Sequence, residues 1–468
     1  MEPISLSKII EATGGTLLSG TPDVEIFGIS TDTRTIHKGD LFVALEGERF
    51  DGHYFIDEAF KKGAIGAIVS REVESKNIII KVRDTLKTLG DIAKIYREEF
   101  DIPVIAVTGS NGKTTTKEML GYILTREFKT VKAKGSYNNF VGVPLTLLEM
   151  DRHTQLAVLE METNLLGGIK RLCEIAKPSV GVVTNIGDTH LQFLKTREGV
   201  YQEKSELVES LPEDGVAVLN ADDPYVLKMK EISRTKRIVT FGVENKSEFS
   251  ASNIRVGDTF LEFTLNNNYR VKLNTISYCN VYNGLAAIAV SHVVFGLSLE
   301  KVIDILKDFK FPSLRMELIE IPLIDRATSN EESVRIINDC YNANPQSMQE
   351  ALVAVGKMNS YTNKIAILGE MLELGEKAPE FHYQIGKICA DCGFDMLITV
   401  GDLAQYMAHG AEDEGMPREN IFVSVNNVEA SDRLLRILRP GDIVLIKGSR
   451  GMKMEEIVER LRKRLGVF

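Results

Sequence analysis

The sequence is poor in cysteine and has no long apolar run. Five cysteines in 468 residues cannot form a disulfide framework. Cys389 and Cys392 form one Cys-x-x-Cys pair without a second pair at zinc spacing, so reduced helix cysteines are expected. The most apolar window, Leu285–Leu297, is interrupted by Ser291 and His292, and a membrane-spanning helix needs roughly 20 consecutive apolar residues. Because no export signal is visible at the N-terminus either, a soluble cytoplasmic protein without membrane insertion is expected.

An excess of basic residues is also missing. Lys and Arg number 56 against 66 Asp and Glu, a net charge of −10. Nonspecific nucleic-acid binding needs a basic surface that replaces counterions on phosphates, so no nucleic-acid partner is expected. The 44% hydrophobic and 26% charged residues are typical of a globular chain, and the length suffices for about three domains.

The first block, residues 1–100, reads as a small mixed α/β domain. Its helical patterns are Asp57–Gly63 and Lys87–Phe100, and the second ends at Asp101-Ile102-Pro103 because proline disfavours the helical conformation of the preceding residue. Strands are expected at Glu25–Ser30, Leu41–Leu45, Ile65–Val69 and Ile78–Val82.

The second block, residues 101–311, alternates apolar strands with helices, a pattern typical of a parallel sheet covered on both faces. Ser247–Leu273 alternates by twos and is expected to form an antiparallel appendage, followed by a helix at Asn283–Phe295. Strands are expected at Val104–Val107, Leu156–Leu159, Val180–Thr184, Val216–Asn220 and Ile238–Phe241.

The third block, residues 312–468, follows a hinge at Phe311-Pro312-Ser313 and is expected to be a doubly wound, Rossmann-like domain. Its polar segment Arg326–Glu332 is expected to be an exposed loop. Strands are expected at Arg335–Asn338, Lys364–Leu368, Met396–Val400 and Asp442–Ile446. The fold class is therefore α/β with three domains, of which the central one has a parallel sheet.

The sharpest motif is Thr108-Gly109-Ser110-Asn111-Gly112-Lys113-Thr114-Thr115. It follows a buried strand and opens a helix, where unpaired N–H groups and the helix dipole favour an anion. The glycines allow close approach of phosphate, Lys113 can reach the β- and γ-phosphates, and Thr114 is placed to bind Mg²⁺. Val107 stands at the first glycine position of the strict pattern, so a structural turn with a surface lysine stays the alternative.

This loop and several other stretches resemble the Mur ligase family, and the central domain accordingly resembles its phosphate-loop ATPase domain. Three of these stretches, Asp339–Pro345, Leu368–Gly375 and Lys447–Arg450, resemble the branch that adds D-alanyl-D-alanine. The matching stretches are Ser30–Arg34 with Asp51-Gly52-His53, Tyr137-Asn138-Asn139 with Gly142-Val143-Pro144, Asp339–Pro345, Leu368–Gly375 and Lys447–Arg450.

The resemblance implies ATP-driven amide synthesis in peptidoglycan precursor assembly. A carboxylate of a UDP-N-acetylmuramoyl tripeptide would take the γ-phosphate of ATP, and D-alanyl-D-alanine would then attack the acyl phosphate. Carboxylate and triphosphate repel, and two like charges 4 Å apart cost about 4 kcal/mol at an effective dielectric of 20. Cations must therefore gather at the γ-phosphate. A monomer is expected.

The resemblance also assigns nucleotide and catalytic residues. ATP would be bound by the loop residues, by Asn283 at the adenine, and by Arg315 and Asp339 once the third domain closes. Lys113, His190, Lys204 and Asp339 would be catalytic. The loop residues expected to bind ATP are Gly109, Ser110, Asn111, Gly112, Lys113, Thr114 and Thr115.

Magnesium would be held by Thr114, Glu160, His190 and Lys204, the lysine as a carbamate. Glu160 ends a strand at the edge where ligands gather, and a carboxylate suits this hard ion. Carbamate formation requires a neutral amine. From the residues alone, Glu160 reads equally as a solvated strand end, His190 as a packing residue and Lys204 as an exposed salt-bridged lysine.

Substrate contacts are implied at Ser30, Asp32, Arg34, Asn138 and Asn139, with the first domain gripping the uridine diphosphate. The segments Gly369–Gly375 and Lys447–Arg450 are candidates for the dipeptide end, without individual roles.

Four positions depart from the family pattern, and two rival functions stay open. Glu162 stands where a glycine is usual, Leu165 and Cys279 replace histidines, and Gly168 replaces a glutamate. One rival is a related ligase with another acceptor such as folate, and the other is a nucleotide-binding scaffold without turnover.

Overall fold

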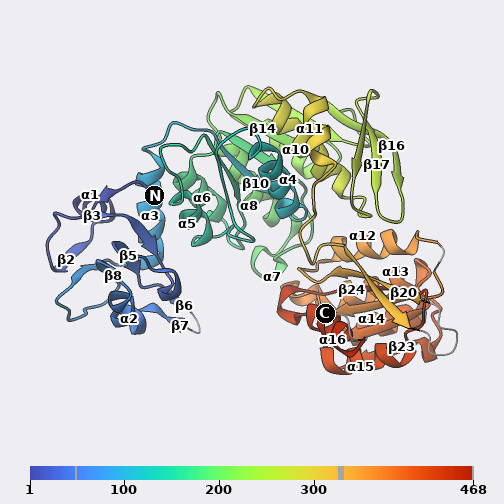
Figure 1. The fold of residues 1–468 in the computed structure, drawn as a ribbon. Helices are drawn as coiled ribbons and strands as arrows, with labels where there is room; N and C mark the ends of the chain where they lie inside the picture. Colours follow the sequence, from blue (N-terminus) through green and yellow to red (C-terminus); the bar gives the residue numbers. More distant parts are fainter. Residues whose placement is uncertain (48–49, 325–330, 360, 466–468) are drawn as a thin grey trace.

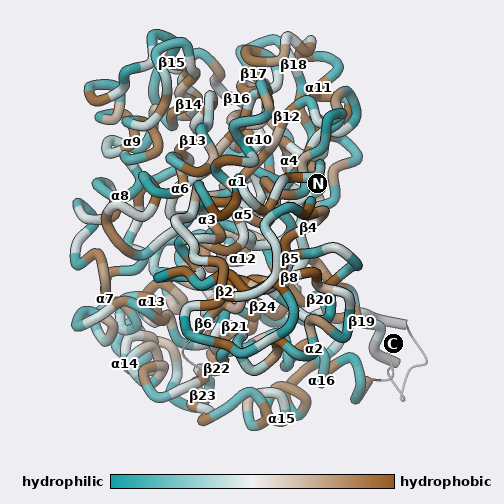
Figure 2. Tube along the Cα trace, turned by 90° about the vertical axis from the view of Figure 1, so that its left-hand side faces the viewer, coloured by the Kyte–Doolittle hydropathy of each residue, from teal (hydrophilic) through white to brown (hydrophobic). Residues whose placement is uncertain are grey.

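The computed structural model describes residues 1–47, 50–324, 331–359 and 361–465. Three α/β domains follow one another along the chain (Figure 1). The blue N-terminal and orange-to-red C-terminal domains flank the central domain, which runs from cyan to yellow. Figure 2 shows hydrophobic stretches running through the interior around α3 and α5. In the described part of the chain, no helix is both long and apolar enough to cross a membrane.

The N-terminal domain is built on a five-stranded sheet of order β2-β9-β8-β5-β4, parallel except for β2. The expected strands are present, with the first divided into β3 and β4. The elements are β1 (Ile4–Ser5), α1 (Leu6–Thr13), β2 (Thr16–Ser19), β3 (Glu25–Ile26), β4 (Gly28–Ser30), η1 (Thr33–Thr35), β5 (Asp40–Val43), β6 (Glu46–Gly47), β7 (Phe50–Asp51), η2 (Gly52–Phe55), α2 (Ile56–Lys61), β8 (Gly66–Val69) and β9 (Ile78–Lys81).

Helix α3 (Thr85–Arg97) joins this domain to the next. Asp84 caps its N-terminus by accepting from the Lys87 amide, and its apolar face packs in a core that includes residues of both domains. The buried Arg97 donates Nε to the Ala176 carbonyl at 3.0 Å and its two Nη atoms to the Phe100 and Ile102 carbonyls. The N-terminal and central domains therefore share one core.

The central domain holds a nine-stranded sheet of order β11-β12-β10-β13-β14-β15-β16-β17-β18. Its first part is parallel, as the apolar strand runs predict. Its strands are β10 (Val104–Thr108), β11 (Thr130–Lys132), β12 (Leu156–Glu160), β13 (Val180–Val183), β14 (Val216–Asn220), β15 (Arg237–Gly242), β16 (Phe249–Val256), β17 (Leu261–Leu265) and β18 (Tyr269–Leu273).

The antiparallel stretch expected at Ser247–Leu273 is present but continues the main sheet. Strand β16 pairs in parallel with β15, and β17 and β18 then add antiparallel strands. Helices pack on both faces of this sheet. They are α4 (Lys113–Leu124), α5 (Gly142–Leu147), α6 (Gly168–Ala176), α7 (Leu191–Leu194), α8 (Arg197–Glu209), α9 (Pro224–Lys228), η3 (Met229–Glu231), α10 (Asn280–Val293) and α11 (Leu299–Leu306).

The C-terminal domain is a six-stranded sheet of order β19-β20-β24-β21-β22-β23, parallel except for β19. Its elements are β19 (Glu317–Ile324), β20 (Glu331–Asp339), α12 (Pro345–Gly356), β21 (Lys364–Gly369), η4 (Gly375–Lys377), α13 (Ala378–Asp391), β22 (Met396–Val400), α14 (Gln405–Asp413), η5 (Arg418–Asn420), β23 (Ile421–Ser424), α15 (Asn427–Ile437), β24 (Ile443–Lys447), η6 (Arg450–Met452) and α16 (Glu455–Leu465).

The third block is also expected to contain a polar loop and a pair of reduced cysteines. The loop expected at 326–332 lies mostly outside the described residues, and its last two residues already belong to β20. Cys389 and Cys392 lie at the end of α13 as free cysteines, and Cys389 is buried.

Candidate active site

The glycine-bearing loop lies between β10 and α4, where its sequence predicts it. Gly109 has φ +140° and Gly112 has φ +82°, in the region that favours glycine. A Cβ on Gly109 would lie 2.0 Å from Thr184 Oγ1, and one on Gly112 would lie 2.3 Å from Asn283 Oδ1. Both glycines are therefore required by backbone conformation and by space.

The end of β13 holds the loop in shape. The backbone amides of Ser110 and Asn111 donate to the Asn185 carbonyl and Oδ1, both at 2.9 Å. Thr184 Oγ1 donates to the Asn111 carbonyl at 2.6 Å. These bonds position the helix N-terminus that would face an anion.

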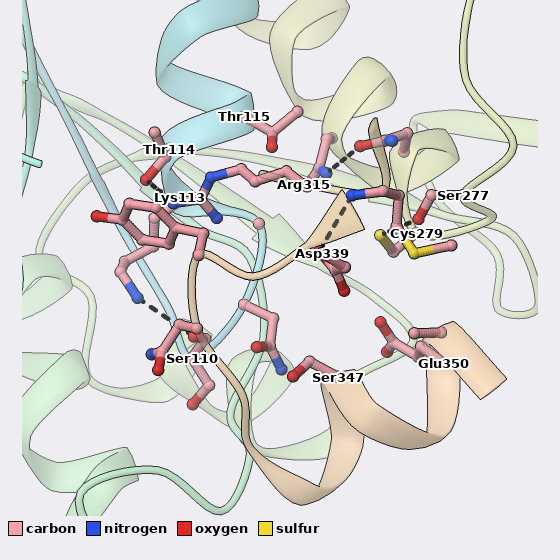
Figure 3. A pocket seen from close by; sticks show the side chains of 18 of the residues that line it. Ser110, Lys113, Thr114, Thr115, Ser277, Cys279, Arg315, Asp339, Ser347 and Glu350 are labelled. Atoms are coloured by element: carbon pink, nitrogen blue, oxygen red, sulfur yellow. Dashed lines mark hydrogen bonds between the residues drawn. The ribbon is translucent and has the colours of Figure 1, made fainter. Parts of the chain in front are cut away.

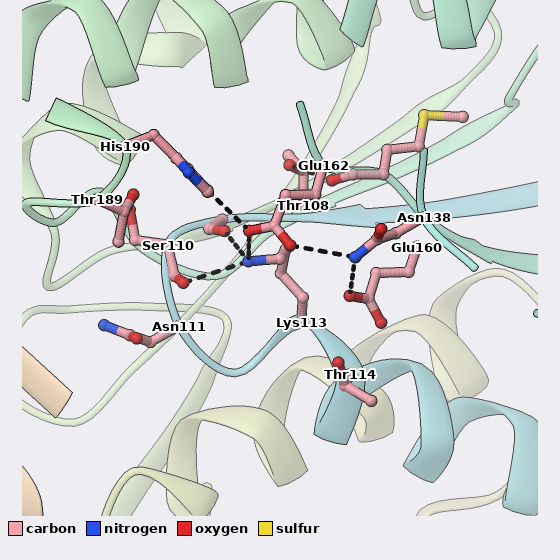
Figure 4. A network of polar contacts seen from close by, with 12 residues as sticks. Thr108, Ser110, Asn111, Lys113, Thr114, Asn138, Glu160, Glu162, Thr189 and His190 are labelled. Atoms are coloured by element: carbon pink, nitrogen blue, oxygen red, sulfur yellow. Dashed lines mark hydrogen bonds and ion pairs between the residues drawn. The ribbon is translucent and has the colours of Figure 1, made fainter. Parts of the chain in front are cut away.

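Lys113 is buried at the base of this loop, which excludes the alternative of a surface lysine. Its Nζ donates to the carbonyls of Gly109 at 2.7 Å and Ser110 at 3.2 Å. It also lies 2.6 Å from Glu162 Oε1 (Figure 4). The ammonium therefore already has three acceptors.

The side-chain amide of Asn138 bridges the carboxylates of Glu160 and Glu162. Asn138 Nδ2 donates to Glu160 Oε1 at 2.9 Å and to Glu162 Oε2 at 3.1 Å. Burial raises the pKa of Glu162, but the Lys113 and His190 charges outweigh burial and hold that pKa well below its usual range. Glu160 is 1% exposed and is not a solvated strand end.

His190 connects this cluster to the C-terminal domain. It precedes α7 with φ +55°, and its Nδ1 lies 2.6 Å from Glu373 Oε2. Its Nε2 lies 3.4 Å from Glu162 Oε1. Burial lowers the pKa of His190, while these two carboxylates raise it and prevail.

Lys204 is fully buried on α8, so the interpretation as an exposed salt-bridged lysine is wrong. Its Nζ lies 2.8 Å from Glu203 Oε2, and Glu203 Oε1 accepts from Thr163 Oγ1 at 2.6 Å. The positive charge of Lys204 helps to lower the Glu162 pKa.

The C-terminal domain contributes Arg315 to the phosphate loop. Arg315 Nη2 donates to Thr114 Oγ1 at 2.8 Å, and its guanidinium lies 3.8 Å from the Tyr341 ring centroid. Asn344 Nδ2 donates to Asn111 Oδ1 at 2.8 Å. In this structure the two domains thus already touch at the loop.

Asp339 ends β20 and faces the same space (Figure 3). Its Oδ1 accepts from the Met316 amide at 3.0 Å, and its Oδ2 lies 2.5 Å from Lys447 Nζ. Lys447 is 2% exposed and also donates to the Asn342 carbonyl at 3.0 Å. Two segments are candidates for the dipeptide end. Lys447 of Lys447–Arg450 lines this pocket, and Glu373 of Gly369–Gly375 contacts His190.

Many of these groups line one pocket of about 120 Å³ between the two domains, whereas His190, Lys204 and Asn138 are not among its lining residues. Asn283 and Cys279 line it from α10 and the turn before it, and burial raises the pKa of the Cys279 thiol to about 12. Residues of the phosphate loop that line it are Ser110, Asn111, Gly112, Lys113, Thr114 and Thr115; Glu160, Glu162, Arg315, Asp339 and Lys447 line it too.

Ser30, Asp32 and Arg34 do not line this pocket. Within the N-terminal domain, Arg34 Nε donates to Asp32 Oδ1 at 2.9 Å, which helps to lower the Asp32 pKa to about 2. The side chain of Asn139 makes hydrogen bonds within its own turn, since its Oδ1 accepts from the backbone amides of Val141 and Gly142. Of the five expected substrate residues, the structure places Asn138 at the phosphate loop.

Sequence reasoning missed several residues of the site. Glu162 was visible as a departure from the family pattern, without a role. Lys117, Asn185 and Glu373 gave no separate signal, because an isolated lysine, asparagine or glutamate in a polar loop or helix is common. Their contacts arise from elements far apart in the chain.

The chemistry of the donor set fits Mg²⁺. Glu160 Oε2 is buried and has no hydrogen-bond partner among the described residues; the nearest cation, Lys117 Nζ, lies at 3.8 Å. In the described ranges, no group of three or more His, Cys, Asp and Glu could hold a metal on its own. This pattern suits an ion that takes one or two carboxylates and completes its shell with phosphates and water.

A phosphate loop in a parallel sheet, with a second α/β domain that completes its pocket, defines a nucleotide-dependent multidomain α/β enzyme. Three family descriptions match the chain in order: "Mur ligase family, catalytic domain" over residues 25–97, "Mur ligase middle domain" over 107–291, and "Mur ligase, glutamate ligase domain" over 315–450.

Relatives match from end to end. The UDP-N-acetylmuramoyl-tripeptide–D-alanyl-D-alanine ligase of Bacillus subtilis is 35% identical over 98% of both chains. A crystal structure of MurF from Acinetobacter baumannii has a TM-score of 0.88 and 31% identity over 99% of both chains. The structure of MurF from Thermotoga maritima in complex with ADP has a TM-score of 0.80 and 29% identity, over 94% of this chain and 97% of that one. The chain belongs to the Mur ligase family, and the three-domain α/β fold expected from the sequence is confirmed.

Proposed function

We propose that this protein is an ATP-dependent ligase that adds D-alanyl-D-alanine to a UDP-N-acetylmuramoyl tripeptide in peptidoglycan precursor synthesis. The observation that carries this is the single pocket in which the phosphate loop meets Arg315, Asp339 and Lys447 of the C-terminal domain. The end-to-end similarity to the Bacillus subtilis ligase favours this function over a folate-type ligase or a scaffold.

The reaction proceeds in two balanced steps. A carboxylate oxygen of the tripeptide attacks the γ-phosphorus, the bond to the β,γ-bridging oxygen breaks, and ADP leaves an acyl phosphate behind. The amine of D-alanyl-D-alanine then attacks the acyl carbon, loses a proton, and phosphate departs as the C–O bond breaks. Both steps concentrate negative charge, so cations at the γ-phosphate lower the barrier.

Cations from two domains converge on the position of the triphosphate. Lys113 lies under the loop and Arg315 lies against Thr114. Lys447 is held toward the pocket by Asp339. We assign ATP binding to the loop residues Gly109–Thr115, with Arg315 and Asp339 contributed by the C-terminal domain and Asn283 at the adenine end. The domain contact would exclude water from the acyl phosphate.

Magnesium would be held by Glu160, Thr114 and His190, with Lys204 as a carbamate. When bound, the ion neutralises charge on the phosphate oxygens. The unpartnered Glu160 Oε2 supports its assignment. Thr114 contacts Arg315 and His190 contacts Glu373 in this structure, so both would exchange partners on loading.

We assign three roles to three parts of the chain. Residues 1–100 would bind the UDP moiety through Ser30, Asp32 and Arg34; residues 101–311 would bind ATP; and residues 312–468 would close over ATP and receive the dipeptide. Asn138 and Asn139 would face the acceptor. We propose that the protein acts as a monomer in the cytoplasm, where its nucleotide substrates are found.

The test is a direct synthesis with the purified protein. Incubation with ATP, MgCl₂, UDP-N-acetylmuramoyl tripeptide and D-alanyl-D-alanine should yield a pentapeptide product by mass, with ADP and phosphate in equal amounts. Replacing D-alanyl-D-alanine by D-glutamate, or both substrates by a folate and glutamate, should yield no product. Absence of ADP formation with every muramoyl peptide would reject the proposal.

A further inference from the structure

The ammonium of Lys113 has three acceptors within the protein. Two are carbonyls of the loop itself, Gly109 at 2.7 Å and Ser110 at 3.2 Å. The third is Glu162 Oε1 at 2.6 Å. Since an ammonium has three donors, a phosphate oxygen gains one only by replacing an acceptor. Of these three acceptors, Glu162 is the charged one and belongs to another element.

Glu162 has other donors to hold it once Lys113 leaves. Asn138 Nδ2 lies 3.1 Å from Oε2, and His190 Nε2 lies 3.4 Å from Oε1. Glu162 stands where the family usually has a glycine, which cannot compete for the lysine. The contact therefore depends on the side chain at position 162 and not on the backbone of the phosphate loop.

We propose that Glu162 is a resident counter-anion of the phosphate loop that holds Lys113 until the triphosphate of ATP displaces it. The released carboxylate stays on Asn138 and His190, a few ångströms from the bound phosphates. Because Glu162 competes for Lys113 and repels the incoming anion, it weakens nucleotide binding and keeps the empty loop ordered. This inference rests on the proposed function, since ATP is the displacing anion.

The experiment measures ADP binding by calorimetry in EDTA and in excess Mg²⁺, for the wild-type protein and Glu162→Gln. Glutamine keeps the size and hydrogen bonds of the side chain but removes its charge. In EDTA, Glu162→Gln should bind ADP about tenfold more tightly, as expected when one like charge is removed near the phosphates. ADP should also raise its melting temperature more than it raises that of wild type.

Two further variants complete the comparison. Glu162→Gly restores the residue usual in the family, should also tighten ADP binding, and serves if Glu162→Gln does not fold. Glu174→Gln removes an exposed carboxylate of α6 that pairs with Arg171, and its affinity should equal that of wild type.

Several results would overturn the proposed role of Glu162 or the proposed function on which it rests. Unchanged or weaker ADP binding by the folded variants in EDTA overturns the proposal. Weakening confined to Mg²⁺ also overturns it, because Glu162 would then be a metal ligand. If the wild-type protein binds no ADP at all, the proposed function fails as well; if it binds ADP and the variants bind no better, only the role of Glu162 fails.

Discussion

Single side chains in and around the pocket show how this chain positions its buried cations. Each basic group is held by a nearby acid or carbonyl: Lys113 by Glu162, Lys447 by Asp339 and Lys204 by Glu203. Such pairs fix the position of a charge, whereas an unpaired buried charge would cost several kcal/mol. On the proposed roles, these residues would exchange partners during the reaction, so substitutions should be designed to retain shape.

Asp339→Asn tests the acid that holds Lys447. Asparagine keeps an acceptor for the Met316 amide but loses the charge, so Lys447 is no longer fixed. We expect ligation by the folded variant to fall at least about 100-fold, comparable to the loss of one transition-state contact. The melting temperature should fall as well, because the buried Lys447 loses its counter-charge. Asp402→Ala, at an exposed position of the same domain, is the control. Turnover near the wild-type rate would reject the assignment.

Lys204→Ala tests the carbamate. A carbamate forms only on a neutral amine, so the amine would have to leave Glu203 Oε2 at 2.8 Å and present a new carboxylate to the metal. Lys204→Ala should therefore be inactive and regain ligation when formate or acetate is added, measured as phosphate release. The exposed Lys228→Ala should be active and insensitive to these acids. Failure of every short carboxylic acid to rescue would contradict the carbamate.

At the scale of elements, the sequence predicts central strands and misses edge strands. The strands that were not anticipated in the three large sheets are β2, β11, β19 and β23, and each lies at a sheet edge. Strands β2, β11 and β23 are short and only partly buried, so they lack a continuous apolar run. Strand β19 also contains Pro322, which reads as a loop signal but is tolerated at an edge.

The residues of the site also fall into two groups, those predictable from local residue order and those brought together only by the tertiary fold. The phosphate loop follows from local residue order, because its anion site is built by one strand, one turn and one helix. The contacts of Glu162 with Lys113 and of His190 with Glu373 depend on elements brought together by the tertiary fold. Sequence alone therefore allowed a prediction of the nucleotide residues but could not give these acids a role.

Gly109→Ala tests the turn between β10 and α4. The new Cβ would lie 2.0 Å from Thr184 Oγ1 at φ +140°, so the turn must shift. We expect a loss of about 1–3 kcal/mol in the free energy of unfolding and a loss of ADP binding in calorimetry. Gly415→Ala also has positive φ, +103°, but meets open space, and it should leave ADP affinity unchanged. Wild-type affinity in Gly109→Ala would show that the turn tolerates a side chain.

For the whole molecule, the arrangement of hydrophobic cores predicts two cooperative units. One core joins the N-terminal and central domains through α3, whereas the cores of the C-terminal domain consist of its own buried residues apart from Ile276 of the central domain. Scanning calorimetry should therefore resolve two transitions, and ADP with Mg²⁺ should raise the temperatures of both, because the nucleotide would contact both units.

Arg97→Ala separates the two transitions. Its loss leaves the carbonyls of Ala176, Phe100 and Ile102 without their donor, at a cost of about 1–3 kcal/mol for each buried group left unsatisfied. Only the transition of the first unit should move to lower temperature. A single transition for the wild-type chain, or an equal shift of both in Arg97→Ala, would contradict this division.

The shared core under α3 has a consequence for building hybrid enzymes. A chimaera joined near residues 311–313 would exchange a self-contained domain, and the recipient would keep its own packing intact. A junction near residue 100 would instead cut through interlocked side chains, so a foreign N-terminal domain would have to bring matching surfaces of α5 and α6 with it. Transplants that aim to change the incoming amine should therefore succeed more readily than those that aim to change the nucleotide-linked acceptor.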